Sequence, residues 1–174
     1  MDTAAARFNI VASDAPVAEF RRVLLATDLS AVSDRAADHA IEISAEHGAS
    51  LLVLSVVDPS ALRIAGGRFL RRMDQERSRV EKAAQALVAR AHAAGVQATF
   101  LVWEGEPAES IVAASASEGV DLIILGSHRR GRLGRLILGS VSRVVEHEAR
   151  CEVRVVPVGS PSPDGFDNWA TSLS

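Results

Sequence analysis

The stretch GVDLIILGSHRRGRLGRLILGSVSRVV, residues 119–145, contains the pattern that decides the fold. Its apolar run at residues 120–125 is almost uninterrupted, which is typical of a strand buried on both faces of a parallel sheet. A segment rich in glycine and arginine follows. Gly139 and Ser140 then precede an expected helix, of which Ser140 can be the N-cap. This stretch therefore predicts a strand, a loop and a helix in succession.

Four further apolar runs lie at residues 23–26, 51–57, 96–103 and 153–156, and segments with helical periodicity separate them. The helical segments end at Gly48, Gly95 and Gly119, and glycine readily adopts the left-handed conformation that follows a helix. This alternation predicts a doubly wound α/β domain. We expect five parallel strands in the order 3-2-1-4-5, with helices on both faces of the sheet.

Three of the expected helices lie between the strands. The first begins near Ser30 and ends at residues 47–48, the second covers residues 69–94, and a shorter one begins at Pro107. The second carries a single core-facing stripe, formed by Met73, Val80, Ala84, Leu87 and Ala91. Residues 59–67 contain a proline and paired glycines, and we expect a long loop there.

Composition and charge limit the classes of function. The chain has 174 residues, 48% of them hydrophobic. This length predicts one domain at residues 21–158, between loose tails at residues 1–20 and 159–174. Because 19 basic and 22 acidic residues leave a net charge of −3, generic binding to nucleic acid or to a membrane surface is not expected. The single cysteine and the lack of a secretory signal pattern favour the cytoplasm.

The most informative candidate site lies after the first and fourth strands, where a doubly wound sheet binds its ligands. Asp28 follows the first of these strands and Gly126 follows the fourth. Positive charge is concentrated after Gly126, on Arg129, Arg130, Arg132, Arg135 and Arg143. Between Gly126 and position 146 there is no acidic residue. Together with the amino terminus of the following helix, these arginines predict an anion site. The alternative is a solvated turn whose arginines aid solubility.

Catalytic and metal centres have no support in the sequence. The five histidines lack the spacing of metal ligands, and neither a serine-hydrolase elbow nor a Walker motif is present. Cys151 is expected to be a buried structural thiol. No catalytic residue and no metal ligand are therefore assigned.

The sequence resembles the universal stress protein family, specifically its ATP-binding branch. The resemblance covers residues 21–158 and rests on VLLATDLS at 23–30, LLVLSVVD at 51–58, GEPAESI at 105–111 and LILGSVSRVV at 136–145. The family's nucleotide motif is G-x-x-G, nine residues, then G-[ST]. Gly126, Gly139 and Ser140 match this motif, but Arg129 stands at the position of its second glycine. That guanidinium can either bind a phosphate or occlude the site.

The resemblance implies an adenine nucleotide alpha-hydrolase-like fold that binds ATP, with Mg²⁺ as a possible companion ion. It places the adenine beside Val56 and Leu125, and the ribose or phosphates near Ala26 and Asp28. Gly126 would lie against the sugar. The β- and γ-phosphates would be held by Gly139, Ser140, Val141 and Ser142. For Asp28, capping of the following helix is an equally good interpretation.

The leading functional hypothesis is a regulatory ATP-binding module of a stress response, with the phosphates held by the loop at residues 126–142. One alternative is a nucleotide-free dimeric scaffold, and another is a slow ATP hydrolase or nucleotidyl transferase. The apolar edge strand at residues 152–156 invites a second strand, and the resemblance implies an antiparallel homodimer through it.

Overall fold

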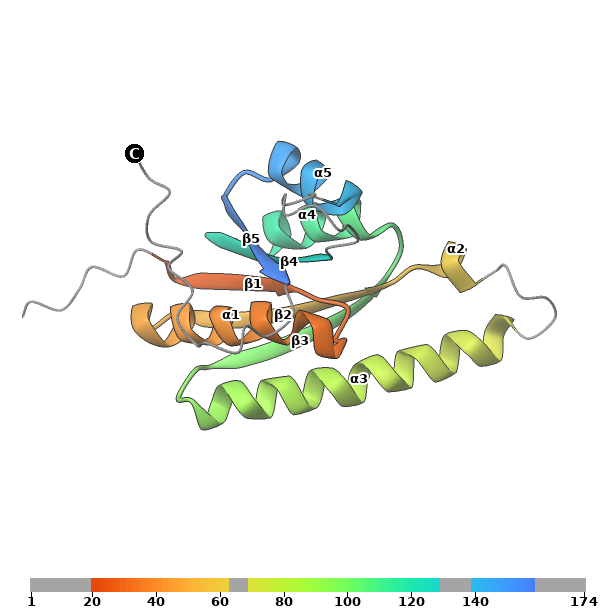
Figure 1. Ribbon diagram of the computed structural model, residues 1–174, viewed down its shortest axis with the longest axis horizontal. Coiled ribbons are helices and arrows are strands. Elements are labelled where there is room, and N and C mark those ends of the chain that lie inside the picture. Colours follow the sequence, from red (N-terminus) through yellow and green to blue (C-terminus); the bar gives the residue numbers. More distant parts are fainter. Residues whose placement is uncertain (1–19, 63–68, 129–138, 159–174) are drawn as a thin grey trace, which may run out of the picture.

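The computed structural model describes residues 20–62, 69–128 and 139–158, which form one five-stranded parallel sheet in the order β3-β2-β1-β4-β5 (Figure 1). This order confirms the predicted topology. The strands are β1 (Arg22–Ala26), β2 (Ser50–Val57), β3 (Ala98–Glu104), β4 (Leu122–His128) and β5 (Glu152–Val158). Each predicted apolar run lies within or overlaps its strand, although the ends shift by up to three residues.

Helices cover both faces of the sheet, as predicted. In Figure 1, α1 (Asp34–His47) and α3 (Phe69–Ala93) lie below the sheet, whereas α4 (Pro107–Ser117) and α5 (Ser140–Glu148) lie above it. Two cores result, one on each face. On the α1/α3 face the core includes Val23, Leu25 and Ile124, and on the α4/α5 face it includes Leu24, Ile123 and Val145.

The burial of the central strands on both faces explains why their sequences do not alternate between polar and apolar residues. All residues of β1 from Val23 to Ala26 are buried, as are those of β4 from Leu122 to Leu125. Successive side chains of a strand point to opposite faces, and here each face is covered by helices. Both sets of side chains must therefore be apolar.

The structure corrects the predicted start of the first helix. A short 3-10 helix, η1 (Ala31–Ser33), precedes α1. Ser30 occupies its N-cap position, as expected, but the side chain of Ser30 makes no capping hydrogen bond, and α1 itself begins only at Asp34. The backbone amide of Ser30 instead donates to Asp28 Oδ1 over 3.0 Å. The carboxylate of Asp28 therefore stabilises the turn that precedes the helices, but Asp28 is not the N-cap of either one, because those positions are Ser30 and Ser33.

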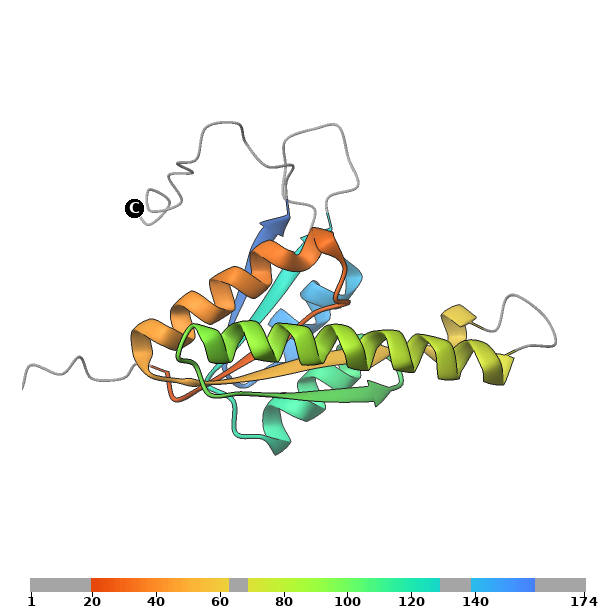
Figure 2. The same ribbon diagram turned by 90° about the horizontal axis from the view of Figure 1, so that it is seen from below.

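Two other predictions on the α1/α3 side were wrong in part. The expected loop at residues 59–67 begins with a short helix, α2 (Pro59–Leu62), and residues 63–68 lie outside the described part of the chain. Met73 is only partly buried, although Val80, Ala84, Leu87 and Ala91 are buried as expected. The reason is visible in Figure 2, where the first turns of α3 extend beyond the ends of the strands.

A carboxylate joins the amino ends of the two central strands. Asp121 Oδ2 accepts hydrogen bonds from the amides of Arg21 and Arg22, over 2.8 and 2.9 Å. We expect Asp121→Ala to lower the free energy of unfolding by about 1 kcal/mol, because two backbone donors lose a charged acceptor at a solvent-exposed site. Urea unfolding measures this change. Asp121→Asn keeps an acceptor oxygen and should lose less; an equal loss in both variants would contradict the account.

Within the described residues no helix is long and apolar enough to cross a bilayer. The longest, α3, carries charged side chains on most of its turns.

Candidate functional site

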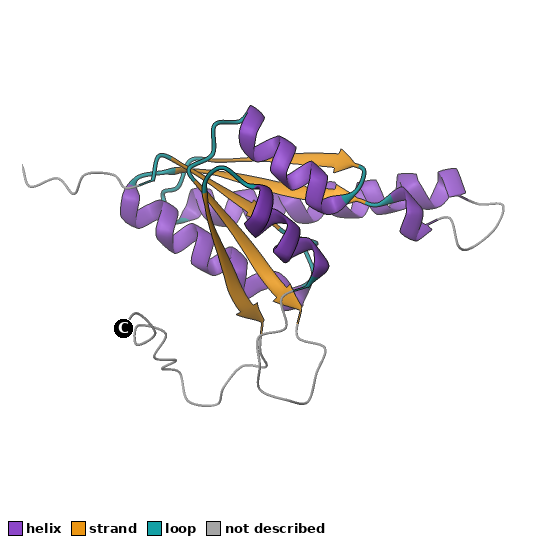
Figure 3. Cartoon of the chain, turned by 90° about the horizontal axis from the view of Figure 1, so that it is seen from above, coloured by secondary structure: helices purple, strands orange, loops and turns teal. Residues whose placement is uncertain are grey.

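The candidate site lies at the carboxyl end of β1, where the chain order of the sheet reverses. Ala26, the last residue of β1, pairs with Leu54 of β2 on one side and with Leu125 of β4 on the other. All three side chains belong to the core on the α4/α5 face. Figure 3 shows the strands fanning apart toward their carboxyl ends, so that β4 and β5 diverge from β2 and β3. Open parallel sheets bind ligands at such a position.

The backbone of Val56 extends beyond the end of β1. The last hydrogen bond between the two strands runs from the Thr27 amide to the Leu54 carbonyl over 3.0 Å. Alternate residues of a strand direct their amide and carbonyl groups to the same side, so those of Val56 point the same way as those of Leu54. β1 ends at Ala26, which pairs with Leu54, so no residue of β1 lies opposite Val56. Val56 therefore presents one donor and one acceptor toward the space that follows β1.

The loop after β1 holds Asp28 through hydroxyl groups. Asp28 Oδ1 accepts from Ser30 Oγ over 2.7 Å, and Ser33 Oγ lies 2.9 Å from the same oxygen. Thr27 Oγ1 donates to Ser33 Oγ over 2.9 Å and accepts from the Leu29 amide over 3.0 Å. Leu29 has a φ of 56°, a conformation that is unfavourable for leucine. The hydroxyl contacts stabilise a strained loop that fixes the carboxylate.

Arg79 of helix α3 forms an ion pair with Glu76 of the same helix. A side-chain hydrogen bond to Glu76, and more weakly the negative charge of Asp28, raise the pKa of Arg79 above its ordinary value. Sequence reasoning missed Thr27 and Ser33 as members of the hydrogen-bonded loop around Asp28. The two hydroxyl residues could have been found from their positions beside Asp28 in the run ATDLSAVS, since short hydroxyl side chains commonly satisfy a turn carboxylate.

The amino terminus of α5 has the features of an anion site. Its N-cap is Gly139, not Ser140 as expected, and the cap makes no side-chain hydrogen bond. Gly139 and Ser140 are exposed, and no acidic residue occupies the first turn. The first amides of a helix have no partner within the helix, and the helix dipole is positive there. Within the described residues no partner is seen for these amides, so a phosphate could bind them.

The other residues predicted to contact the ribose and phosphates lie in different environments. Ser142 is buried, and its hydroxyl donates to the Gly139 carbonyl over 3.0 Å. Val141 is half-buried against the core of the α4/α5 face. Gly126 lies within β4 and pairs with Val156 of β5. Arg129 lies outside the described residues.

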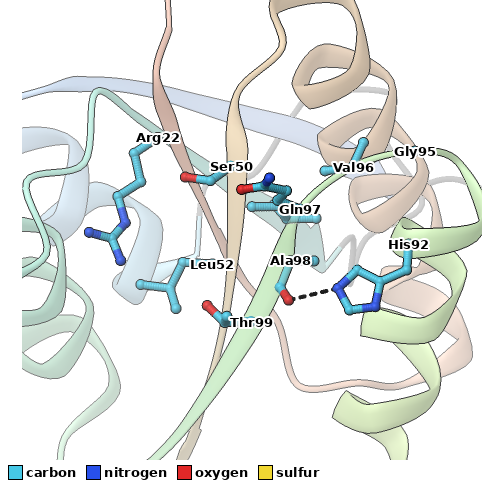
Figure 4. A pocket seen from close by; sticks show the side chains of 10 residues that line it. Arg22, Ser50, Leu52, His92, Gly95, Val96, Gln97, Ala98 and Thr99 are labelled. Carbon is cyan, nitrogen blue, oxygen red and sulfur yellow. Dashed lines mark hydrogen bonds between the residues drawn. The ribbon is translucent and has the colours of Figure 1, made fainter.

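The structure therefore brings together Ala26, Leu125 and the backbone of Val56 at one end of the sheet. A separate cavity of about 420 Å³ lies at the opposite end, beside the amino ends of β1, β2 and β3 (Figure 4). There His92 Nε2 lies 3.0 Å from the Ala98 carbonyl oxygen. Because the first residues of the strands line this cavity, it is distinct from the candidate site.

Neither a metal cluster nor an activated thiol is found in the described part of the chain. No group of three or more His, Cys, Asp or Glu side chains there is placed to hold a metal ion. Cys151 is half-buried, not fully buried as expected. Burial, and to a lesser degree the charge of Asp121, raise the pKa of its thiol. A raised pKa lowers the fraction of reactive thiolate, which is consistent with a structural role.

The comparisons with known proteins agree on one protein family. The model of the universal stress protein family matches residues 19–157. A Thermus aquaticus protein described as "Universal stress protein in QAH/OAS sulfhydrylase 3'region" is 35% identical over 137 residues, which are 79% of this chain and 98% of that protein.

Solved structures share the fold. The structure of MJ0577, a protein of Methanocaldococcus jannaschii, is similar with a TM-score of 0.71 and 23% identity, covering 82% of this chain and 99% of that one. A universal stress protein crystallised in complex with cAMP has a TM-score of 0.61 and 25% identity, covering 80% of this chain and 98% of that one.

Proposed function

Because this chain belongs to the universal stress protein family, we propose that it is a regulatory ATP-binding module of a stress response. Its activity would be binding itself, with nucleotide occupancy biasing contact with a protein partner. The observation that carries this proposal is the position of α5, whose exposed, uncapped amino terminus follows the segment that leaves β4. The complex of a relative with cAMP supports an adenine nucleotide as the class of ligand.

The backbone of Val56 favours adenine over guanine. Its carbonyl can accept a hydrogen bond from the 6-amino group of adenine while its amide donates to N1. Guanine presents a carbonyl oxygen and an N–H at these two positions, so that acceptor would face acceptor and donor would face donor. Unpaired polar groups in a binding site discriminate strongly between ligands.

The phosphates would lie against the amides of residues 139–142, with the guanidinium of Arg129 as a further donor. Asp28 supplies the one carboxylate of the candidate set. It would accept ribose hydroxyls or, when Mg²⁺ is bound with the phosphates, contribute an oxygen ligand to the ion. Because three donors already lie around Asp28 Oδ1, its orientation is fixed before a ligand arrives.

Isothermal titration calorimetry with Mg-ATP tests this proposal. We expect saturable binding at one site per chain, and weaker binding of Mg-GTP. A ligand that binds only the folded protein also raises its melting temperature. Absence of both heat and thermal shift at millimolar ATP would rule out the nucleotide module and leave the nucleotide-free scaffold.

A second copy of the chain is the proposed partner of β5. This strand forms one edge of the sheet, and the Glu152 amide donates to the Asp121 carbonyl on the β4 side. Glu152 and Arg154 therefore direct their backbone groups toward β4, whereas Val153, Val155 and Pro157 direct theirs outward. Proline at an outward position is tolerated in an edge strand. The outward groups of the two valines are available to an antiparallel strand.

Substitution of one outward residue should separate dimerisation from folding. We expect Val155→Pro to convert a dimer into a monomer in light scattering at micromolar concentration, because it removes an outward amide and leaves the β4 pairing intact. Arg154→Pro removes an amide that faces β4 and should instead lower the melting temperature. A monomeric wild-type chain would contradict the predicted dimer.

A further inference from the structure

Two opposite charges lie next to each other on β5, the strand at one edge of the sheet. Arg154 Nε donates to Glu152 Oε1 over 2.7 Å, and the side chains of Arg154 and Glu152 are 37% and 46% exposed. Because Val153 and Val155 pack against the core of the α4/α5 face, the two charged side chains point to the α1/α3 face. There the guanidinium of Arg154 lies over the ring of Phe20, 5.2 Å from its centroid.

The backbone of β5 limits how a second copy can pair with it. In an antiparallel ladder, residues that direct their amide and carbonyl groups across the interface lie directly opposite one another. In β5 these outward residues are Val153, Val155 and Pro157. Three registers place one valine opposite another: Val153 opposite the partner's Val153, Val153 opposite the partner's Val155, or Val155 opposite the partner's Val155. These registers differ in the side chain that lies opposite Arg154.

Charge and proline distinguish the three registers. With Val153 opposite itself, Glu152 of each copy lies opposite the partner's Arg154. With Val153 opposite the partner's Val155, the two copies of Arg154 lie opposite each other. With Val155 opposite itself, Val153 faces the partner's Pro157, which has no amide to donate. Opposite charges directly across a ladder stabilise the pairing and like charges destabilise it, so the first register is favoured.

On the basis of the proposed β5 dimer, we propose that Glu152 and Arg154 set its register and select a second copy of this chain as the partner. Val153 lies opposite the partner's Val153, and each Glu152 contacts the partner's Arg154. The two carboxylates and two guanidinium groups then alternate in sign, both along each strand and across the interface. An edge strand with a different order of charges would meet like or unpaired charges and would bind more weakly.

Reversal of one charge tests the contact between the copies. We expect either Glu152→Arg or Arg154→Glu to raise the dimer dissociation constant about tenfold, because two attractive pairs across the interface become repulsive. When the two variants are mixed, each chain still lacks the ion pair along its own strand, but both pairs across the interface are restored. The mixture should therefore form heterodimers nearly as tightly as the wild type dimerises.

Light scattering measures dissociation of each variant, and native mass spectrometry of an equimolar mixture, with one variant tagged, counts the dimeric species. Arg72→Glu is the matched control, because it changes the net charge as Arg154→Glu does. Arg72 is exposed in the first turn of α3, a helix that packs on β2 and β3, away from β5. This control should dimerise as the wild type does and show no preference for the Glu152→Arg chain.

Disulfide formation tests the register itself. Cys151 is the single cysteine of the chain, so Val153→Cys in a Cys151→Ser background carries one thiol. The proposed register places this thiol opposite its copy, within reach of a disulfide, and mild oxidation should link the two chains. Val155→Cys in the same background is the matched control on another outward residue. Its two copies would lie four residues apart along the strands, so it should remain unlinked.

The outcomes separate the role of these charges from the dimer on which it rests. A dimeric wild type whose charge variants gain no heterodimers on mixing would overturn the role of Glu152 and Arg154 and leave the dimer standing. Linkage of Val155→Cys, or a dimeric Val153→Cys that does not link, would overturn the register. A monomeric wild type at micromolar concentration would overturn both. Thermal unfolding of each variant shows whether it is folded.

Discussion

Gly139→Glu is expected to reduce Mg-ATP affinity at least about 100-fold, because a carboxylate would stand at the helix end assigned to the phosphates and like charges in contact cost several kcal/mol. The fold should tolerate the change. Gly139 has a φ of −64°, and a Cβ built there would approach only Ser142 Oγ, at 4.0 Å. Loss of binding could then be attributed to charge and shape at the site.

Calorimetry on the folded variant measures this loss. Ala113→Glu is a matched control, because Ala113 is exposed on the neighbouring helix α4 and the substitution adds the same charge. This control should bind Mg-ATP as the wild type does. Unchanged affinity of Gly139→Glu would show that the phosphates lie elsewhere.

Leu54→Ala should lower the free energy of unfolding by about 3 kcal/mol, the size found when a fully buried leucine is truncated in a packed core. Leu54 is fully buried beneath the candidate site, between Ala26 of β1 and Leu101 of β3. The loss combines the missing apolar contact with the cavity left behind. Chemical denaturation measures it from the shift of the transition midpoint.

Leu70→Ala is the control for the same chemical change. Leu70 is 76% exposed in the first turn of α3, so its truncation removes little buried surface. We expect its unfolding free energy to stay within about 0.5 kcal/mol of the wild type. Equal losses in both variants would contradict the assignment of the core.

Much of the fold follows from hydrophobicity alone. The runs at residues 23–26 and 120–125 predict buried central strands. The glycines at helix ends predict where each helix stops and the chain enters the next strand. Details that depend on tertiary geometry do not follow. Met73 has the correct spacing for the core stripe, but the sheet ends before it, so the first turns of α3 find no strand to cover.

At the candidate site, too, some features can be predicted from the sequence and others depend on tertiary geometry. The motif residues Gly126 and Gly139 could be assigned from spacing. The direction of the Val56 backbone could not, because it depends on which strand pairs with β2 and where that strand ends. The N-cap at Gly139 was missed for a local reason: Ser140 is a good capping residue by type, but the helix begins with it.

The position of the triphosphate is the central claim, and a crystal structure of the chain grown with saturating Mg-ATP tests it most directly. We predict phosphate oxygens against the amides of residues 139–142 and the adenine edge on the Val56 backbone. Nucleotide bound at the amino ends of the strands, or crystals that contain no nucleotide at millimolar ATP, would contradict it.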